Sequence, residues 1–142
     1  MISIRHVGLV VDNIEKSFEL YKDILGFVPK VDYIEKGNFY EHLTGLKSGV
    51  ARIVKCYSDN GSCIEFIQYQ SPSSKKRHKD ITSDGFSHIA LNVKNLESLH
   101  KKLLAIGLEF IGNPKLNPDK NAIVAFCRDF EGNLLELVQT NF

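Results

Sequence analysis

His6-Val7-Gly8-Leu9-Val10-Val11-Asp12-Asn13 is followed 82 residues later by a similar stretch, His88-Ile89-Ala90-Leu91-Asn92-Val93-Lys94-Asn95. A second pair of similar stretches lies 71 residues apart: Gly61-Ser62-Cys63-Ile64-Glu65-Phe66-Ile67-Gln68 and Gly132-Asn133-Leu134-Leu135-Glu136-Leu137-Val138-Gln139. Each half of the chain therefore carries one His and one Glu in the same order. Two such half-sites, brought together by pseudo-twofold symmetry, would form a metal site of two imidazoles and two carboxylates.

The first half is predicted to contain a strand, a helix and three further strands. Residues 2–11 alternate as in a strand that is covered on one face. Asp12 and Glu15 have the spacing of a capping box at a helix start, and Gly26 supplies the helix stop. The apolar stripe of this helix is Ile14, Phe18, Tyr21 and Leu25. Further strands are predicted over 27–34, 50–57 and 62–69, with a less regular segment over 35–49.

The second half follows the same plan, with a helix from near Asn95 to a stop at Gly107. Its predicted strands cover 87–93, 108–112, 122–127 and 134–140. Each half is thus a βαβββ module, and sheets with helices on one side are typical of an α+β domain. We expect a single domain over 1–142, with module one at 1–70, a linker at 71–84 and module two at 85–142.

Glu65 and Glu136 each lie in the middle of an apolar predicted strand, with apolar neighbours on the same face. A carboxylate in such a place is costly to bury unless it is paired or binds a metal. In the two first strands, the His shares its face with a small residue, Gly8 or Ala90. The larger aliphatic side chains occupy the opposite face, which a helix would cover. The repetition of this pattern in both halves makes chance a poor explanation.

Composition describes an ordinary globular protein and excludes several partners. The 142 residues include 43% apolar and 25% charged residues, with a net charge of +1. This balance predicts no strong attraction to nucleic acid or to an anionic membrane, and no run approaches the ~18 apolar residues of a membrane span. The N-terminus lacks the pattern of a signal peptide. Three cysteines without CxxC spacing indicate buried reduced thiols and a cytoplasmic location.

A polar segment joins the halves, Ser71-Pro72-Ser73-Ser74-Lys75-Lys76-Arg77-His78-Lys79-Asp80. It could form a basic patch for an anionic substrate. A solvated linker is the favoured interpretation, because short charged runs with Ser and Pro usually stay in water.

The chain resembles the vicinal oxygen chelate superfamily, which includes glyoxalase I, methylmalonyl-CoA epimerase, extradiol dioxygenases, and bleomycin- and fosfomycin-resistance proteins. The resemblance covers essentially the whole chain. It rests on five stretches: His6-Val7-Gly8-Leu9-Val10-Val11, Tyr21-Lys22-Asp23-Ile24-Leu25-Gly26-Phe27, Cys63-Ile64-Glu65-Phe66, Gly85-Phe86-Ser87-His88-Ile89-Ala90 and Arg128-Asp129-Phe130-Glu131-Gly132-Asn133-Leu134-Leu135-Glu136-Leu137. Families of this kind pair their βαβββ modules so that two curved sheets form an open, cup-shaped mixed sheet around a metal, with helices outside.

The resemblance implies a metalloenzyme of the lyase and isomerase branch. His6, Glu65, His88 and Glu136 match its four ligand positions, and these donors suit one divalent ion such as Zn, Ni, Co, Mn or Fe. The implied reaction, lactoylglutathione-lyase-like or epimerase-like, removes a proton beside a carbonyl of a small oxygenated substrate and passes through a metal-stabilised enediolate. The resemblance implies Glu136 as the base, with Glu65 on the opposite side. It also implies a homodimer, and the half-sites could meet within one chain or across two.

Departures from the family pattern keep other functions open. Bacterial glyoxalase I carries an Arg and an Asn that hold glutathione, where this chain has Val10 and Tyr69. One alternative is a non-catalytic resistance protein that sequesters a drug or metabolite with apolar walls. Another is an extradiol-type dioxygenase, against which the fourth ligand position, Glu65, argues.

The longer middle segment of the first half supplies further candidates. His42, Tyr40 and Arg52 lie in or beside it and could form a lid or a substrate wall. Placement on the surface is at least an equal expectation for all three.

Overall fold

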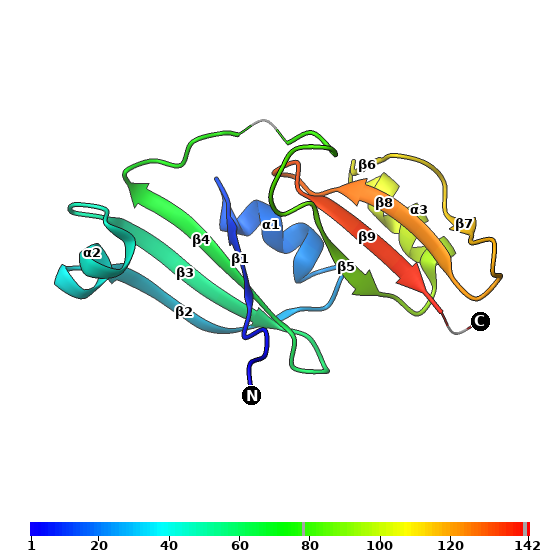
Figure 1. Ribbon diagram of the computed structural model, residues 1–142, viewed down its shortest axis with the longest axis horizontal. Helices are drawn as coiled ribbons and strands as arrows, with labels where there is room; N and C mark the ends of the chain where they lie inside the picture. Colours follow the sequence, from blue (N-terminus) through cyan, green and yellow to red (C-terminus); the bar gives the residue numbers. More distant parts are fainter. Residues whose placement is uncertain (78, 141) are drawn as a thin grey trace. The chain divides into compact units, whose positions relative to one another are not determined.

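The computed structural model describes residues 1–77, 79–140 and 142, and divides them into two compact units, Met1–Lys76 and Arg77–Phe142. Figure 1 shows one β-sheet in each unit. The first unit contains β1 (Val7–Val10), α1 (Ile14–Tyr21), β2 (Val28–Lys36), α2 (Asn38–Thr44), β3 (Val50–Tyr57) and β4 (Cys63–Ser71). The second contains β5 (His88–Asn92), α3 (Leu96–Ala105), β6 (Glu109–Phe110), β7 (Lys115–Leu116), β8 (Ile123–Arg128) and β9 (Leu134–Gln139).

Both sheets are open and mixed, and their strand orders are equivalent. The first has the order β1-β4-β3-β2, and the second has the order β5-β9-β8-β6, with β7 also paired to β8. In each sheet the first strand pairs in parallel with the last one, and the remaining pairs are antiparallel. The predicted α+β class with two βαβββ-like modules is therefore confirmed.

Each sheet buries one face against its helix (Figure 1). In the first unit, the fully buried ring of Phe66 on β4 makes edge contacts with Tyr21 and Phe18, at centroid distances of 5.1 and 6.2 Å. In the second unit, the fully buried leucines come from α3 and β9: Leu96, Leu103, Leu135 and Leu137. Every second residue of the last strand thus points at the helix, and the residues between them point to the opposite face.

The first turns of α1 and α3 are capped by equivalent hydrogen bonds. Asn13 Oδ1 accepts from Lys16 N at 3.0 Å, and the equivalent Asn95 Oδ1 accepts from Ser98 N at 2.9 Å. The predicted capping role of Asp12 is therefore wrong, because Asn13 has the extended N-cap conformation. The last strand of each unit also contributes, since Gln68 and Gln139 Oε1 accept from the first helical N–H at 2.9 and 2.7 Å.

The segment that the sequence left irregular contains α2, which has no counterpart in the second unit. Gly37 has φ 91° before it and Gly45 has φ 70° after it, a left-handed conformation that glycine adopts without strain. The buried side chain of α2 is Tyr40, which packs against Ala51 and Ile53 and the half-buried Ile67 and Tyr69. These partners lie on the face of the sheet opposite α1.

Part of the predicted linker belongs to the second unit and is hydrogen-bonded within it. Lys79 Nζ donates to Glu131 O at 2.9 Å and to Asn133 Oδ1 at 2.8 Å, in the turn before β9. Its neighbour His78 lies outside the described residues. In the described ranges, the longest helices fall short of the length and apolar character that a membrane crossing requires.

Two cysteine thiols should be inert in the folded protein. All three cysteines are free, and burial raises the pKa of Cys56 to about 11 and that of Cys127 to about 12. We expect neither thiol to react with Ellman's reagent at pH 8, whereas denatured protein should expose all three. Unfolded thiols ionise near pH 9, so unfolding releases protons and the stability should fall as the pH rises from about 9 through 11 and 12. Rapid modification of two or more native thiols at pH 8 would contradict this assignment.

Candidate metal centre

In the first unit, strand pairing places His6 beside Glu65. Gly8 is the register partner of Glu65 in the parallel β1–β4 pair, and His6 lies two residues before Gly8, on the same face. His6 Nε2 lies 3.8 Å from Glu65 Oε2, with side chains that are 31% and 15% exposed. We call this face of the sheet, opposite the helix, the site face.

The second unit repeats the arrangement. Ala90 is the register partner of Glu136, and His88 precedes Ala90 by two residues. His88 Nε2 lies 3.3 Å from Glu136 Oε2, with side chains that are 35% and 25% exposed. Ser87 Oγ is hydrogen-bonded to His88 Nδ1 at 3.0 Å, which leaves Nε2 directed at the carboxylate. The small residues Gly8 and Ala90 leave room beside each carboxylate.

The donor chemistry and spacing fit a divalent ion. Tetrahedral ligands at about 2.0–2.2 Å from a metal lie about 3.3–3.6 Å from one another. The His88–Glu136 spacing meets this value, and the His6–Glu65 spacing meets it after a movement of a few tenths of an ångström. Within either unit, no third His, Cys, Asp or Glu among the described residues joins the pair. A four-ligand site built from these donors therefore needs both pairs.

The two pairs differ at one neighbouring position. On β3, Lys55 is the register partner of Glu65, and its Nζ lies 3.5 Å from Glu65 Oε2. On β8, the equivalent partner of Glu136 is Phe126, whose ring packs edge-on against His88 at a centroid distance of 5.3 Å. Lys55 is not among the site residues predicted from the sequence, although the 71-residue offset that aligns the two Glu residues also aligns Lys55 with Phe126.

Arg52 does not form a substrate wall on the site face. Arg52 and Lys55 lie three residues apart on β3, so their side chains are on opposite faces of the sheet, and Arg52 is on the helix-covered face. There it donates to Asp32 at 3.0 and 2.8 Å and to Glu15 at 2.6 Å. The hydrogen bonds from Arg52 lower the pKa of both carboxyl groups, and they raise the pKa of the guanidinium itself. Arg52 thus ties β2, β3 and the first turn of α1 together.

The other two candidates lie on α2. His42 is exposed, whereas Tyr40 lies over the site face of the first sheet with Tyr69. The pKa of the Tyr40 hydroxyl is raised mainly by burial and, to a smaller extent, by a hydrogen bond with Tyr69. Tyr69 stands at the position that corresponds to the glutathione-binding Asn of bacterial glyoxalase I. In this protein its side chain packs against Tyr40 of α2.

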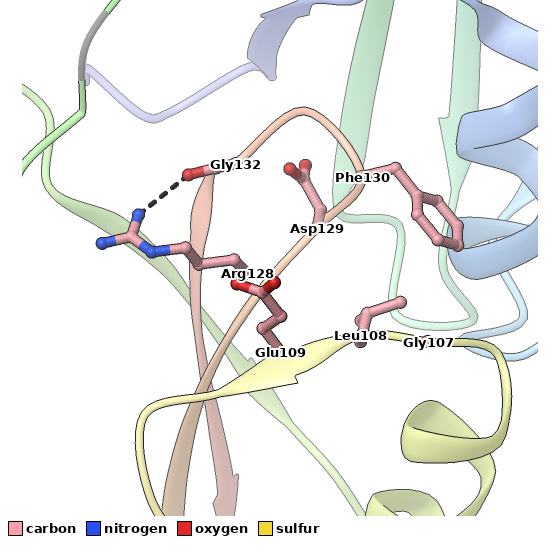
Figure 2. A pocket seen from close by; sticks show the side chains of 7 residues that line it. All are labelled: Gly107, Leu108, Glu109, Arg128, Asp129, Phe130 and Gly132. Carbon is pink, nitrogen blue, oxygen red and sulfur yellow. Dashed lines mark hydrogen bonds between the residues drawn. The ribbon is translucent and has the colours of Figure 1, made fainter.

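Two hollows in the second unit lie away from the His88–Glu136 pair. One has a volume of about 280 Å³ and is lined by Gly107, Leu108, Glu109, Arg128, Asp129, Phe130 and Gly132. Figure 2 shows the Arg128 side chain directed at Gly132 O, to which it donates at 2.9 Å. Asp129 accepts from Glu131 N and Asn133 N and so holds the turn before β9. The other hollow, about 460 Å³, lies by the start of α3 and includes His100 and Gln139. Neither contains a predicted ligand.

Comparison with known proteins gives one family. The pattern of the Glyoxalase/Bleomycin resistance protein/Dioxygenase superfamily matches residues 3–137. A protein of Synechocystis sp. named probable lactoylglutathione lyase is 27% identical over 139 residues, which cover 96% of this chain and 94% of that protein.

Solved structures share the fold at low sequence identity. A glyoxalase family protein from Bacillus cereus is 19% identical with a TM-score of 0.90, over 98% of this chain and 94% of its own. A fosfomycin resistance protein from Listeria monocytogenes, solved in complex with Mn(II) and sulfate, is 14% identical with a TM-score of 0.65, over 100% of this chain and 96% of its own.

Proposed function

Because the chain belongs to the Glyoxalase/Bleomycin resistance protein/Dioxygenase superfamily, we propose that it is a metal-dependent lyase or isomerase. Its substrate in this proposal is a small oxygenated molecule that loses a proton from a carbon next to a carbonyl. The observation that carries the proposal is the repeated His–Glu pair, with imidazole and carboxylate atoms 3.8 and 3.3 Å apart on equivalent strands.

His6, Glu65, His88 and Glu136 would hold the ion. The proposal requires both units to contribute, either within one chain or across a homodimer. When bound, a divalent metal supplies Lewis-acid polarisation of the substrate carbonyl. Zn, Ni, Co, Mn and Fe all accept such a set of nitrogen and oxygen ligands.

Glu136 is the proposed base. Its carboxylate is the more exposed of the two, 25% against 15% for Glu65, so a substrate reaches it more easily. Its cross-strand neighbour is the apolar Phe126, whereas Glu65 has an ammonium group beside it. In this proposal Glu136 accepts the proton from the substrate carbon and returns it, and Glu65 remains a ligand on the other side. Glutathione is no part of the proposal, because Val10 and Tyr69 stand where its polar contacts would be.

The proposal predicts metal binding and metal-dependent proton exchange in one preparation. Protein stripped with a chelator should take up about one divalent ion per chain, and a 100-fold excess of metal over Kd should stabilise it by about 2.7 kcal/mol. In D2O, the loaded protein should exchange the protons beside the carbonyl of hydroxyacetone or a related hydroxyketone, as followed by NMR. The stripped protein is the control.

Other outcomes would favour other members of the superfamily. Absence of metal uptake together with an unchanged melting temperature would contradict the proposal and favour a sequestering protein. Oxygen consumption with catechols in the presence of Fe(II), without proton exchange, would favour an extradiol-type dioxygenase.

A further inference from the structure

Lys55 distinguishes the first half-site from the second. It extends from β3 on the site face, directly across from Glu65, with Nζ 3.5 Å from the Glu65 carboxylate and a side chain that is 22% exposed. His6 Nε2 lies 3.8 Å from the same carboxylate oxygen, Oε2. The ammonium group and the imidazole thus share one oxygen of Glu65, so Lys55 lies within the half-site.

A second cation lies near this end of the same face. Tyr57, two residues after Lys55 on β3, pairs with Cys63 on the site face. Lys30 Nζ lies 5.6 Å from the centroid of the Tyr57 ring. The second half-site has an aromatic ring at the position of Lys55. The second half-site also has a cation on this face, Arg128, but it lies two residues after Phe126 on β8 and donates to Gly132 O at 2.9 Å. The two half-sites therefore differ in whether a cation lies directly across from the carboxylate.

A metal would change the surroundings of Lys55. Two neutral imidazoles, two carboxylates and a divalent ion balance to zero charge, so the ammonium group becomes an uncompensated, partly buried cation next to the metal. Such a charge is costly unless an anion lies beside it. A substrate that chelates the metal through neighbouring oxygens would place its own groups at this location.

We propose that Lys55 is a substrate-binding residue that selects chelating substrates with an anionic oxygen group next to the metal-binding oxygens, as in 2-oxo and 2-hydroxy acids. This inference rests on the proposed function and narrows its substrate class. Lys55 donates to the anionic group of the substrate.

The test uses full-length protein loaded with Mn(II), whose effect on water proton relaxation reports ligand binding at the metal. The two probes are pyruvate and hydroxyacetone, which have similar size and neighbouring oxygens but differ in charge. Lys55→Met should weaken pyruvate binding about 10- to 100-fold, the usual effect of losing a hydrogen bond to a charged group. It should leave hydroxyacetone binding unchanged and should not weaken Mn(II) binding, because it removes a repulsive charge.

Two further variants serve as controls. Lys55→Arg keeps the charge and should retain pyruvate binding within a few-fold. Lys101→Met removes an ammonium group that is also paired with a carboxylate, Glu97 at 2.9 Å, but on the exposed surface of α3, and it should bind pyruvate like the wild type. Equal pyruvate affinity in wild type and Lys55→Met, with Mn(II) bound to both, would overturn this inference alone. Failure of the wild type to bind Mn(II) would overturn the proposed function and the role of Lys55 with it.

Discussion

Replacement of Glu136 by alanine is expected to lower the affinity of the protein for a divalent metal about 100-fold. Binding energies of about 10–16 kcal/mol for four-ligand zinc sites correspond to roughly 3 kcal/mol per ligand, which is about two factors of ten. The loss should appear in metal titrations against a competing chelator. Proton exchange should disappear as well, because the proposed base is removed.

The half-site repeat makes this prediction sharper. His6→Ala, Glu65→Ala and His88→Ala should each produce a loss of similar size, since each removes one of four ligands. Glu97→Ala, which removes an exposed carboxylate on α3, should leave metal affinity unchanged. A loss confined to the variants of one unit would show that the metal is held by that half-site alone, and the four-ligand proposal would fail.

Phe66→Ala should cost about 3–5 kcal/mol of the free energy of unfolding. The ring is fully buried between α1 and the first sheet, where it contacts Phe18 and Tyr21. Its removal leaves a cavity that the surrounding aromatic rings and strands fill only in part. Urea denaturation followed by circular dichroism would measure the loss as a lower midpoint.

Phe39→Ala is the matched control for this core substitution. Phe39 lies on α2 with 68% of its surface exposed, and its removal should change stability by less than about 0.5 kcal/mol. Equal loss of unfolding free energy in both variants would contradict this prediction. It would mean that the buried ring of Phe66 stabilises the fold no more than an exposed ring does.

The sequence predicted the features that repeat. The equivalent positions of His6 and His88, and of Glu65 and Glu136, were sufficient to expect each His beside the Glu of its own half. The strand register supplies that proximity. Their roles as metal ligands stay a prediction.

The features that do not repeat were harder to predict. The helix α2 has a short sequence between two glycines and a single buried side chain, Tyr40, so it shows no apolar stripe. Arg52 lies near that segment in sequence, but the alternation of side chains along β3 turns it to the helix-covered face. The helix cap is Asn13, one residue after the predicted Asp12. Asp and Asn are both suitable N-cap residues, so only the backbone conformation shows which of the two is the cap.

The parallel pairing of the first and last strands of each unit has a consequence during synthesis. Val7 of β1 pairs with Ile64 of β4, so β1 cannot form its strand pairing until nearly the whole unit has left the ribosome. Until then β1 has no partner strand in the nascent chain. Because this pairing joins segments far apart in the sequence, we expect it to form late and slowly. The same is true of β5 and β9. Since His6–Glu65 and His88–Glu136 are joined only by these pairings, each half-site is completed at the end of folding, and a metal ion would enter a framework that is already formed.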